Sequence, residues 1–203
     1  MKQFSVVSRP LPVLHGRKIK VGAWLTAFVV LLGSLAQIAQ AQTNKRDPMT
    51  DAEIDQMREA ADFPNKRLEL MVRFAKERIA MIELLQPDSE SASTRPKQVH
   101  DYLQDFISLL DEIDDNIEMY QSHQTDMRKG LKLVIEADSE WQLKLRQLKE
   151  KAPSAEVEQY SFVLSNAVDS VADSARNARE TLQEQNTLAQ QKKLNKDYSQ
   201  RKD

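Results

Sequence analysis

The sequence contains no cysteine and little glycine, and these shortages exclude several kinds of chemistry. Without cysteine the chain cannot form a disulfide, use a thiolate nucleophile or attach a c-type haem. Only one glycine, Gly130, lies beyond residue 33, so no glycine-rich loop is present to cradle phosphate. No Gly-x-Ser-x-Gly nucleophile elbow occurs either. We therefore predict that the protein is not an enzyme and that it has no catalytic residues.

Histidine is also scarce, with three in the chain and two, His100 and His123, beyond residue 41. A zinc site needs three or four converging ligands. The Glu-x-x-His pairs of di-iron bundles are missing, because Lys97 and Tyr120 stand three residues before the two histidines. We therefore predict no metal ligand and no cofactor. A periplasmic metal- or haem-binding helical bundle is kept as an alternative, since non-covalent haem could use Met and His.

The first 41 residues contain no acidic side chain and are typical of a secretory signal peptide. The segment begins with five basic residues: Lys2, Arg9, Arg17, Lys18 and Lys20. An apolar run (Val21–Leu35) and the sequence Ala39-Gln40-Ala41 follow, which predicts cleavage after Ala41. We expect an exported protein, periplasmic or extracellular, without a stable membrane span after cleavage. An inner-membrane signal anchor is the alternative, although the run is shorter than the ~20 residues of a spanning helix.

Charge excludes one class of partner. The formal charge is −2 over the whole chain, and since the first 41 residues carry five basic and no acidic residues, the remainder carries −7. An acidic exported domain has no basic face for phosphates, so we predict no nucleic-acid partner. We expect a disordered polar linker over residues 42–49, one helical-bundle domain over 50–190, and a polar, frayed C-terminal tail over 191–203.

The clearest helical pattern lies in Val99–Tyr120. Its apolar residues recur at alternating steps of four and three: Val99, Leu103, Phe106, Leu110, Ile113, Ile117 and Tyr120. This spacing is typical of a helix that packs along its length against other helices. No segment shows sustained two-residue alternation, so no strand is predicted. The fold class is therefore all-α, an antiparallel bundle of about four main helices plus a short N-terminal helix.

The other helices follow from caps, prolines and periodicity. Thr50 and Glu53 form a capping box at the start of the short helix. The next helix starts near Pro64, ends near Leu85 and is apolar over more than half of its circumference, so it should contact several neighbours. A loop over Pro87–Pro96 separates it from the central helix. The last helix begins near Ser154, and its inward positions are Val157, Tyr160, Leu164, Ala167, Val168, Val171, Ala175, Ala178 and Leu182.

The connection after Tyr120 has two interpretations. The four-three spacing continues in phase through Leu131, Val134, Asp138, Trp141, Leu145 and Leu148, as in one continuous helix. That helix would be roughly 80 Å long, which its neighbours could not cover in a compact domain. The polar stretch before Gly130 favours a hairpin that is broken near Ser122–Asp126. A continuous helix over Val99–Leu148 would instead favour a self-associating coiled-coil protein.

Four acidic residues share one face of the central helix: Asp111, Asp114, Asp115 and Glu118. They could hold a divalent cation weakly or receive a basic partner. We interpret them as a solvated face, partly answered by basic residues of the adjacent helix Lys66–Leu85. Trp141 and Tyr160 are predicted core anchors. The leading hypothesis is a non-enzymatic binding or scaffold protein of the bacterial envelope, with an unknown protein partner that uses the wide helix or the acidic face.

Overall fold

The computed structural model describes residues 47–85 and 93–201, and all structural statements below concern these residues. They contain five helices: α2 Asp51–Glu59, α3 Pro64–Leu84, α4 Arg95–Ser122, α5 Arg128–Lys151 and α6 Ser154–Gln200. No strand occurs in these residues, so the predicted all-α fold of four main helices and a short N-terminal helix is confirmed. The predicted signal peptide and most of the predicted loop over 87–96 lie outside the described residues.

The short helix α2 is held against α3 by a buried ion pair. Thr50 and Glu53 form the predicted capping box: the Thr50 amide donates to the Glu53 carboxylate (2.7 Å), and the Glu53 amide donates to the Thr50 hydroxyl (3.3 Å). The same carboxylate accepts two hydrogen bonds from Arg78 on α3, at 2.9 and 2.7 Å. Burial alone would raise the pKa of Glu53, but the hydrogen bonds from Arg78 and Thr50 outweigh burial and lower it.

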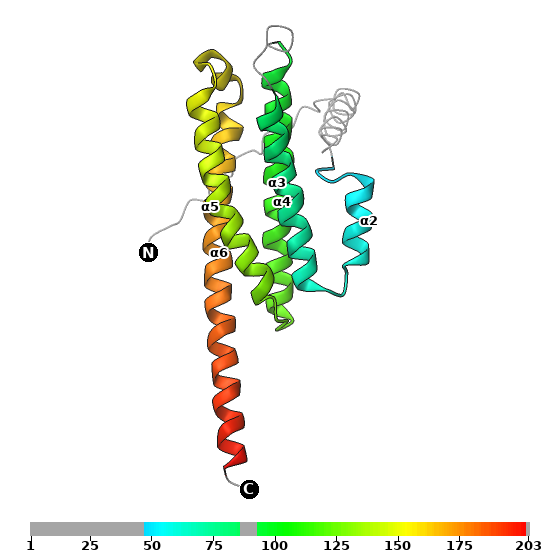
Figure 1. Ribbon diagram of the computed structural model, residues 1–203, viewed down its shortest axis with the longest axis vertical. Helices are drawn as coiled ribbons and strands as arrows, with labels where there is room; N and C mark the ends of the chain where they lie inside the picture. Colours follow the sequence, from blue (N-terminus) through cyan, green and yellow to red (C-terminus); the bar gives the residue numbers. More distant parts are fainter. Residues whose placement is uncertain (1–46, 86–92, 202–203) are drawn as a thin grey trace, which may run out of the picture. The chain divides into compact units, whose positions relative to one another are not determined.

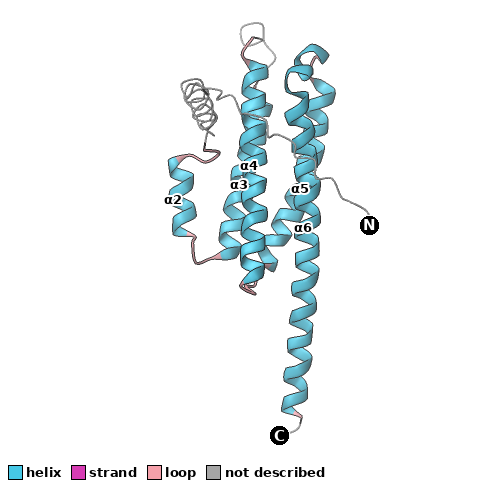
Figure 2. Ribbon diagram, turned by 180° about the vertical axis from the view of Figure 1, so that it is seen from behind, coloured by secondary structure: helices cyan, strands magenta, loops and turns pink. Residues whose placement is uncertain are grey.

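The four long helices form a bundle in which consecutive helices are not always neighbours (Figure 1). α3 packs against α4 and α5, and α6 packs against the same two helices. Each helix reverses the direction of the one before it, so α3 and α5 run one way and α4 and α6 the other (Figure 2). α4 and α5 therefore lie on a diagonal of the bundle although only a short turn separates them.

The predicted break near Ser122–Asp126 is confirmed, because α4 ends at Ser122 and α5 begins at Arg128. The chain reverses through Gln124, whose φ of 54° lies in the left-handed region. The Thr125 amide donates to the Tyr120 carbonyl (3.0 Å), which closes the turn. The interpretation of Val99–Leu148 as one rod-like helix is thus wrong. The shared four-three phase arises because both helices direct their apolar seams toward the same core.

Gly130 lies inside α5 and marks a close contact between helices. A Cβ at this position would come within 2.7 Å of Leu68 Cδ1 and 2.9 Å of Leu68 Cβ on α3. Asn65 of α3 links the two helices at the same contact. Its Oδ1 accepts a hydrogen bond from the Gly130 amide (2.8 Å), and its Nδ2 donates to the Asp126 carbonyl (2.9 Å). We call this region, made of Asn65, Leu68, Asp126 and Gly130, the pinned end of the bundle.

Replacing Gly130 with alanine should destabilise the protein by about 1–3 kcal/mol, because the added Cβ overpacks against Leu68. The opposite effect would be expected at an exposed helical site, where alanine is favoured over glycine by about 1 kcal/mol. Urea unfolding followed by circular dichroism at 222 nm measures the difference. The exposed Ser139→Ala change on the same helix is the control and should shift stability by less than about 0.5 kcal/mol. A more stable Gly130→Ala protein would contradict the close contact.

The core follows the predicted seam. Every apolar seam residue of Val99–Tyr120 is buried, as are the predicted anchors Trp141 and Tyr160. At the centre, Phe106 of α4 meets Trp141 of α5 edge to face, with ring centroids 5.3 Å apart and planes at 82°. Because α4 and α5 are diagonal, this aromatic pair fills the middle of the bundle and contributes to both halves of the core.

The longest helix, α6, departs from prediction in two places. Residues 191–200, which were expected to fray, are helical through Gln200, since Gln, Lys and Leu readily extend a helix that packing has already nucleated. Their side chains are exposed. Val168 was predicted to face inward but is 41% exposed, because Ala167 and Val171 occupy the seam there. The small residues Ala175 and Ala178 are buried as predicted.

Candidate functional site

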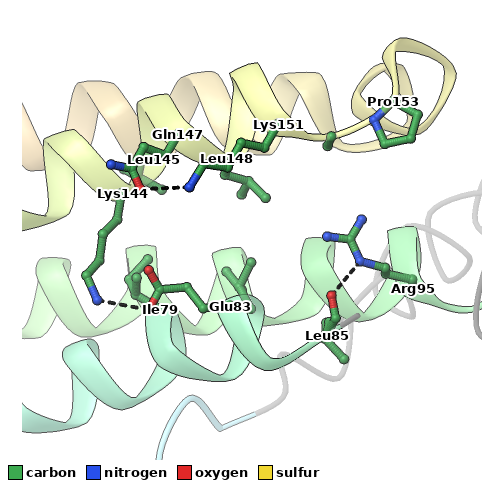
Figure 3. A pocket seen from close by; sticks show the side chains of 12 residues that line it. Ile79, Glu83, Leu85, Arg95, Lys144, Leu145, Gln147, Leu148, Lys151 and Pro153 are labelled. Carbon is green, nitrogen blue, oxygen red and sulfur yellow. Dashed lines mark hydrogen bonds and ion pairs between the residues drawn. The ribbon is translucent and has the colours of Figure 1, made fainter. Parts of the chain in front are cut away.

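A pocket lies at the end of the bundle away from the α4–α5 turn. Figure 3 shows the side chains that line it from close by. The pocket is formed by the last turns of α3 and α5, the start of α4 and the α5–α6 connection, and it has a volume of about 370 Å³. Its floor consists of five aliphatic side chains: Ile79, Ile82, Leu85, Leu145 and Leu148. We call it the end pocket. Its volume falls within the range of known ligand sites, about 300–1,000 Å³.

The end pocket exists because large side chains run out at this end of the core. Ile79, Ile82 and Leu145 form the last closely packed layer, with exposed fractions of 3%, 4% and 1%. Beyond them α5 contributes Leu148, which is only half-buried, and the residue that follows the helix is Ala152, whose methyl group cannot fill the space. The space left between these side chains is open to solvent on one side and has the size of a small-molecule pocket.

Charged side chains form the rim of the end pocket. Lys144 lies 2.9 Å from Glu83 across the opening and 3.4 Å from Glu140, and these carboxylates raise its pKa, mainly through the hydrogen bond to Glu83. Arg95 is fixed by a hydrogen bond to the Leu85 carbonyl (2.8 Å) and by an ion pair with Glu156.

Lys151 completes the rim of the end pocket. It is exposed, and its ammonium group donates to the Gln147 side-chain oxygen at 3.4 Å. No salt bridge to a carboxylate is formed by Lys151 within the described part of the chain. It is therefore the rim cation whose charge remains available to a ligand.

The four acidic residues of α4 do not form one solvated face. Asp111, Asp115 and Glu118 are exposed, as predicted, whereas Asp114 is half-buried against α6. Asn177 of α6 donates to Asp114 at 3.1 Å. Burial raises the pKa of Asp114, and the carboxylates of Asp111 and Asp173 add to the rise.

Three basic residues of α3 form salt bridges with acidic residues outside α4. Lys66 pairs with Glu69 on its own helix, and Arg78 pairs with Glu53 of α2. Lys76 reaches Glu140 of α5 at 3.1 Å. These three pairs join α3 to itself, to α2 and to α5, while Arg67 of α3 donates to the Asn116 side-chain oxygen of α4 at 3.2 Å. The balance between the basic residues of α3 and the acidic face stays a prediction.

Sequence reasoning missed a buried carboxyl group, Asp138 of α5. Its side chain is fully buried, and neither of its oxygens has a hydrogen-bond partner within the described residues. Burial raises the pKa of Asp138 to about 7, against the attraction of Arg179 and with a further rise from Asp114. We call Asp114 and Asp138 the core acid pair. The sequence did contain an indication of this buried group, because Asp138 occupies an inward position of the four-three pattern, between Val134 and Trp141.

The two histidines are not brought together. His100 is half-exposed near the start of α4, with its Nδ1 3.5 Å from Asp101, and His123 is exposed in the turn after that helix. Within residues 47–85 and 93–201, no three His, Cys, Asp or Glu side chains are grouped to hold a metal ion. Over the same ranges, no helix combines the length and apolar character required to cross a membrane.

Comparison of the chain with protein-family models, with curated proteins and with solved structures finds no match. Functional inference therefore depends on the geometry described above. The end pocket combines volume, an aliphatic floor and a cation, Lys151, that forms no salt bridge with the described residues, whereas the core acid pair is enclosed by packed helices.

Proposed function

We propose that this chain is an exported, non-enzymatic binding protein of the bacterial envelope, with the end pocket as its ligand site. The end pocket is the observation that carries the proposal, because an aliphatic floor under a charged rim suits reversible binding. Two of the rim charges, Arg95 and Lys144, are held in ion pairs, an arrangement suited to orienting a ligand. Export is supported by the charge, apolar run and Ala-x-Ala pattern of the first 41 residues.

The other hypotheses have less support. Most of the wide apolar surface of α3 is covered by α2, α4 and α5, and of its large apolar residues only Met81 and Leu84 within the described helix are exposed, which leaves little area for a protein partner. Self-association as a coiled coil depended on a continuous helix over Val99–Leu148, and the turn at Gln124 removes that basis. The exposed end of α6 presents Leu188, Leu194 and Tyr198, whose spacing does not form a four-three seam.

Export and ligand binding can be tested on one preparation. The full-length chain with a C-terminal tag is expressed in a Gram-negative host, and its location and N-terminal residue are determined after osmotic release of the periplasm. We expect a periplasmic protein that begins at Gln42. Native mass spectrometry should then show a small molecule that is released on denaturation. A cytoplasmic protein that keeps residues 1–41 would contradict export, and a ligand-free protein would contradict binding as its main role.

A further inference from the structure

We propose that the end pocket binds a medium-chain fatty-acid anion, with the acyl chain on the aliphatic floor and the carboxylate at Lys151. This inference rests on the proposed binding function and names the ligand class.

The floor is suited to an aliphatic chain. Its side chains belong to isoleucine and leucine, and none of the described residues that line the end pocket is aromatic. Ile79 and Leu145 belong to the closed core, while Leu85 and Leu148 are half-buried and leave apolar surface next to the cavity. Burying a methylene group on such a surface is favourable in itself, whereas flat aromatic ligands gain most from aromatic partners that are missing here.

The rim selects the sign of the ligand's charge. Among the described residues, the lining contains three cations, Arg95, Lys144 and Lys151, and one anion, Glu83. Glu83 is 2.9 Å from Lys144, and Arg95 is paired with Glu156, so these charges are already balanced. The ammonium group of Lys151 contacts only the neutral Gln147 amide among the interactions described, and it therefore favours an anionic head group.

The backbone does not reverse this preference. Two helices, α3 and α5, end at the pocket and place negative partial charges there, while α4 and α6 begin beside it and place positive ones. These opposite ends offset each other around one cavity. The side chains of the rim therefore decide the sign of the ligand.

The size of the cavity limits the ligand to one acyl chain. A volume of about 370 Å³ lies near the lower bound of ligand pockets, which is roughly 300 Å³. A two-chain phospholipid would not fit into this space, whereas a single chain of medium length would. We therefore assign the site to a free fatty-acid anion and not to a membrane lipid.

Calorimetric titration of the protein produced from its full-length sequence, with co-purified ligand removed, tests the assignment with four matched probes. Decanoate carries the chain and the negative charge, decanol carries the chain without charge, decyltrimethylammonium reverses the charge, and acetate lacks the chain. We expect one saturable site for decanoate, binding roughly threefold to tenfold weaker for decanol, and none for the other two. From hexanoate to decanoate, each methylene should tighten binding about fourfold until the floor is filled.

Two variants locate the binding site. Lys151→Glu should weaken decanoate roughly tenfold and leave decanol unchanged, because only the head group is affected. Lys149→Glu is the matched control, since it makes the same charge change in the same helical turn on an exposed residue that does not line the end pocket. It should alter decanoate binding by less than about twofold. Ala152→Leu fills the cavity and should abolish binding of both decanoate and decanol.

Equal affinity for decanoate and decyltrimethylammonium, or unchanged decanoate binding in Lys151→Glu, would overturn the assignment. The probe series uses the unmodified protein, so it decides the matter even if Ala152→Leu fails to fold. A co-purified ligand that decanoate does not displace would refute the fatty-acid inference and leave the binding function intact. A protein that binds neither a co-purified ligand nor any of the four probes would refute both.

Discussion

Replacing Asp138 with asparagine is expected to stabilise the protein at neutral and alkaline pH and to flatten the dependence of its stability on pH. Asp138 is fully buried, and neither oxygen is hydrogen-bonded within the described residues. An ionised carboxylate in this setting loses its hydration without compensation. Asparagine has nearly the same shape but stays neutral at every pH, so the cost of ionisation disappears.

The sign of the pH effect follows from the pKa of Asp138. Burial raises it from 3.8 to about 7 in the folded state, while the unfolded chain keeps the ordinary value. Below pH 3.8 both states are protonated and no penalty exists. As pH rises to about 7, the unfolded state ionises first, and the free energy of unfolding falls by up to about 1.4 kcal/mol per pH unit. The total loss is on the order of 2–4 kcal/mol above pH 7.

The groups around Asp138 supply further checks. Asp114 on α4 raises its pKa and Arg179 on α6 lowers it, so Asp114→Asn should shift the transition of Asp138 to lower pH. Urea unfolding between pH 4 and 8 measures these changes. Glu136→Gln, an exposed change on the same helix, is the control and should leave the slope unaltered. If the free energies of unfolding of the wild type and Asp138→Asn changed with pH in parallel, the pKa of Asp138 would be the same in the folded and unfolded states, which would contradict the prediction.

Replacing Trp141 with alanine should lower the free energy of unfolding by about 3–5 kcal/mol. Trp141 is fully buried at the centre of the bundle and packs edge to face on Phe106. Its removal leaves a cavity between two diagonal helices, which cannot close without moving both halves of the core. Since the indole nitrogen has no hydrogen-bond partner in the described part of the chain, the loss is one of packing.

Guanidinium unfolding followed by far-ultraviolet circular dichroism tests this loss. Leu143→Ala is the control, because Leu143 lies two residues away on α5 and is 54% exposed. Its effect should remain within about 0.5 kcal/mol. A loss below about 1 kcal/mol in Trp141→Ala would mean that the centre of the core is less closely packed than described.

The features that could be predicted from the sequence are those encoded locally. The four-three spacing of Val99–Tyr120 indicates which face of the helix is buried, although it does not identify the helices that pack on that face. The capping box of Thr50 and Glu53 depends on residues three apart, and the turn near Ser122 was favoured by a simple limit on helix length. Tyr160 was recognised as a core anchor for the same reason, because an aromatic residue at an inward position packs in most contexts.

The remaining features depend on which helices become neighbours. Gly130 resembled a turn residue, and only the approach of α3 shows why a side chain is excluded there. Asp114 belonged to an acidic stripe by spacing, yet the position of α6 turns it into part of the core acid pair. The end pocket had no sequence signal of its own. It arises because Ala152, a small residue, follows the last packed layer of the core, which contains Leu145.

The pinned end has a mechanical consequence for the opposite end of α5. Gly130 is fixed against Leu68 near the start of α5, whereas Leu148 borders the end pocket near its finish. About 27 Å of helix separates them at 1.5 Å per residue, so a small change of tilt at the glycine would displace the far end of α5 more than the near end. A tilt of about 5° there moves Leu148 by roughly 2 Å. We therefore expect a side chain added at residue 130 to alter the width of the end pocket as well as the packing on Leu68.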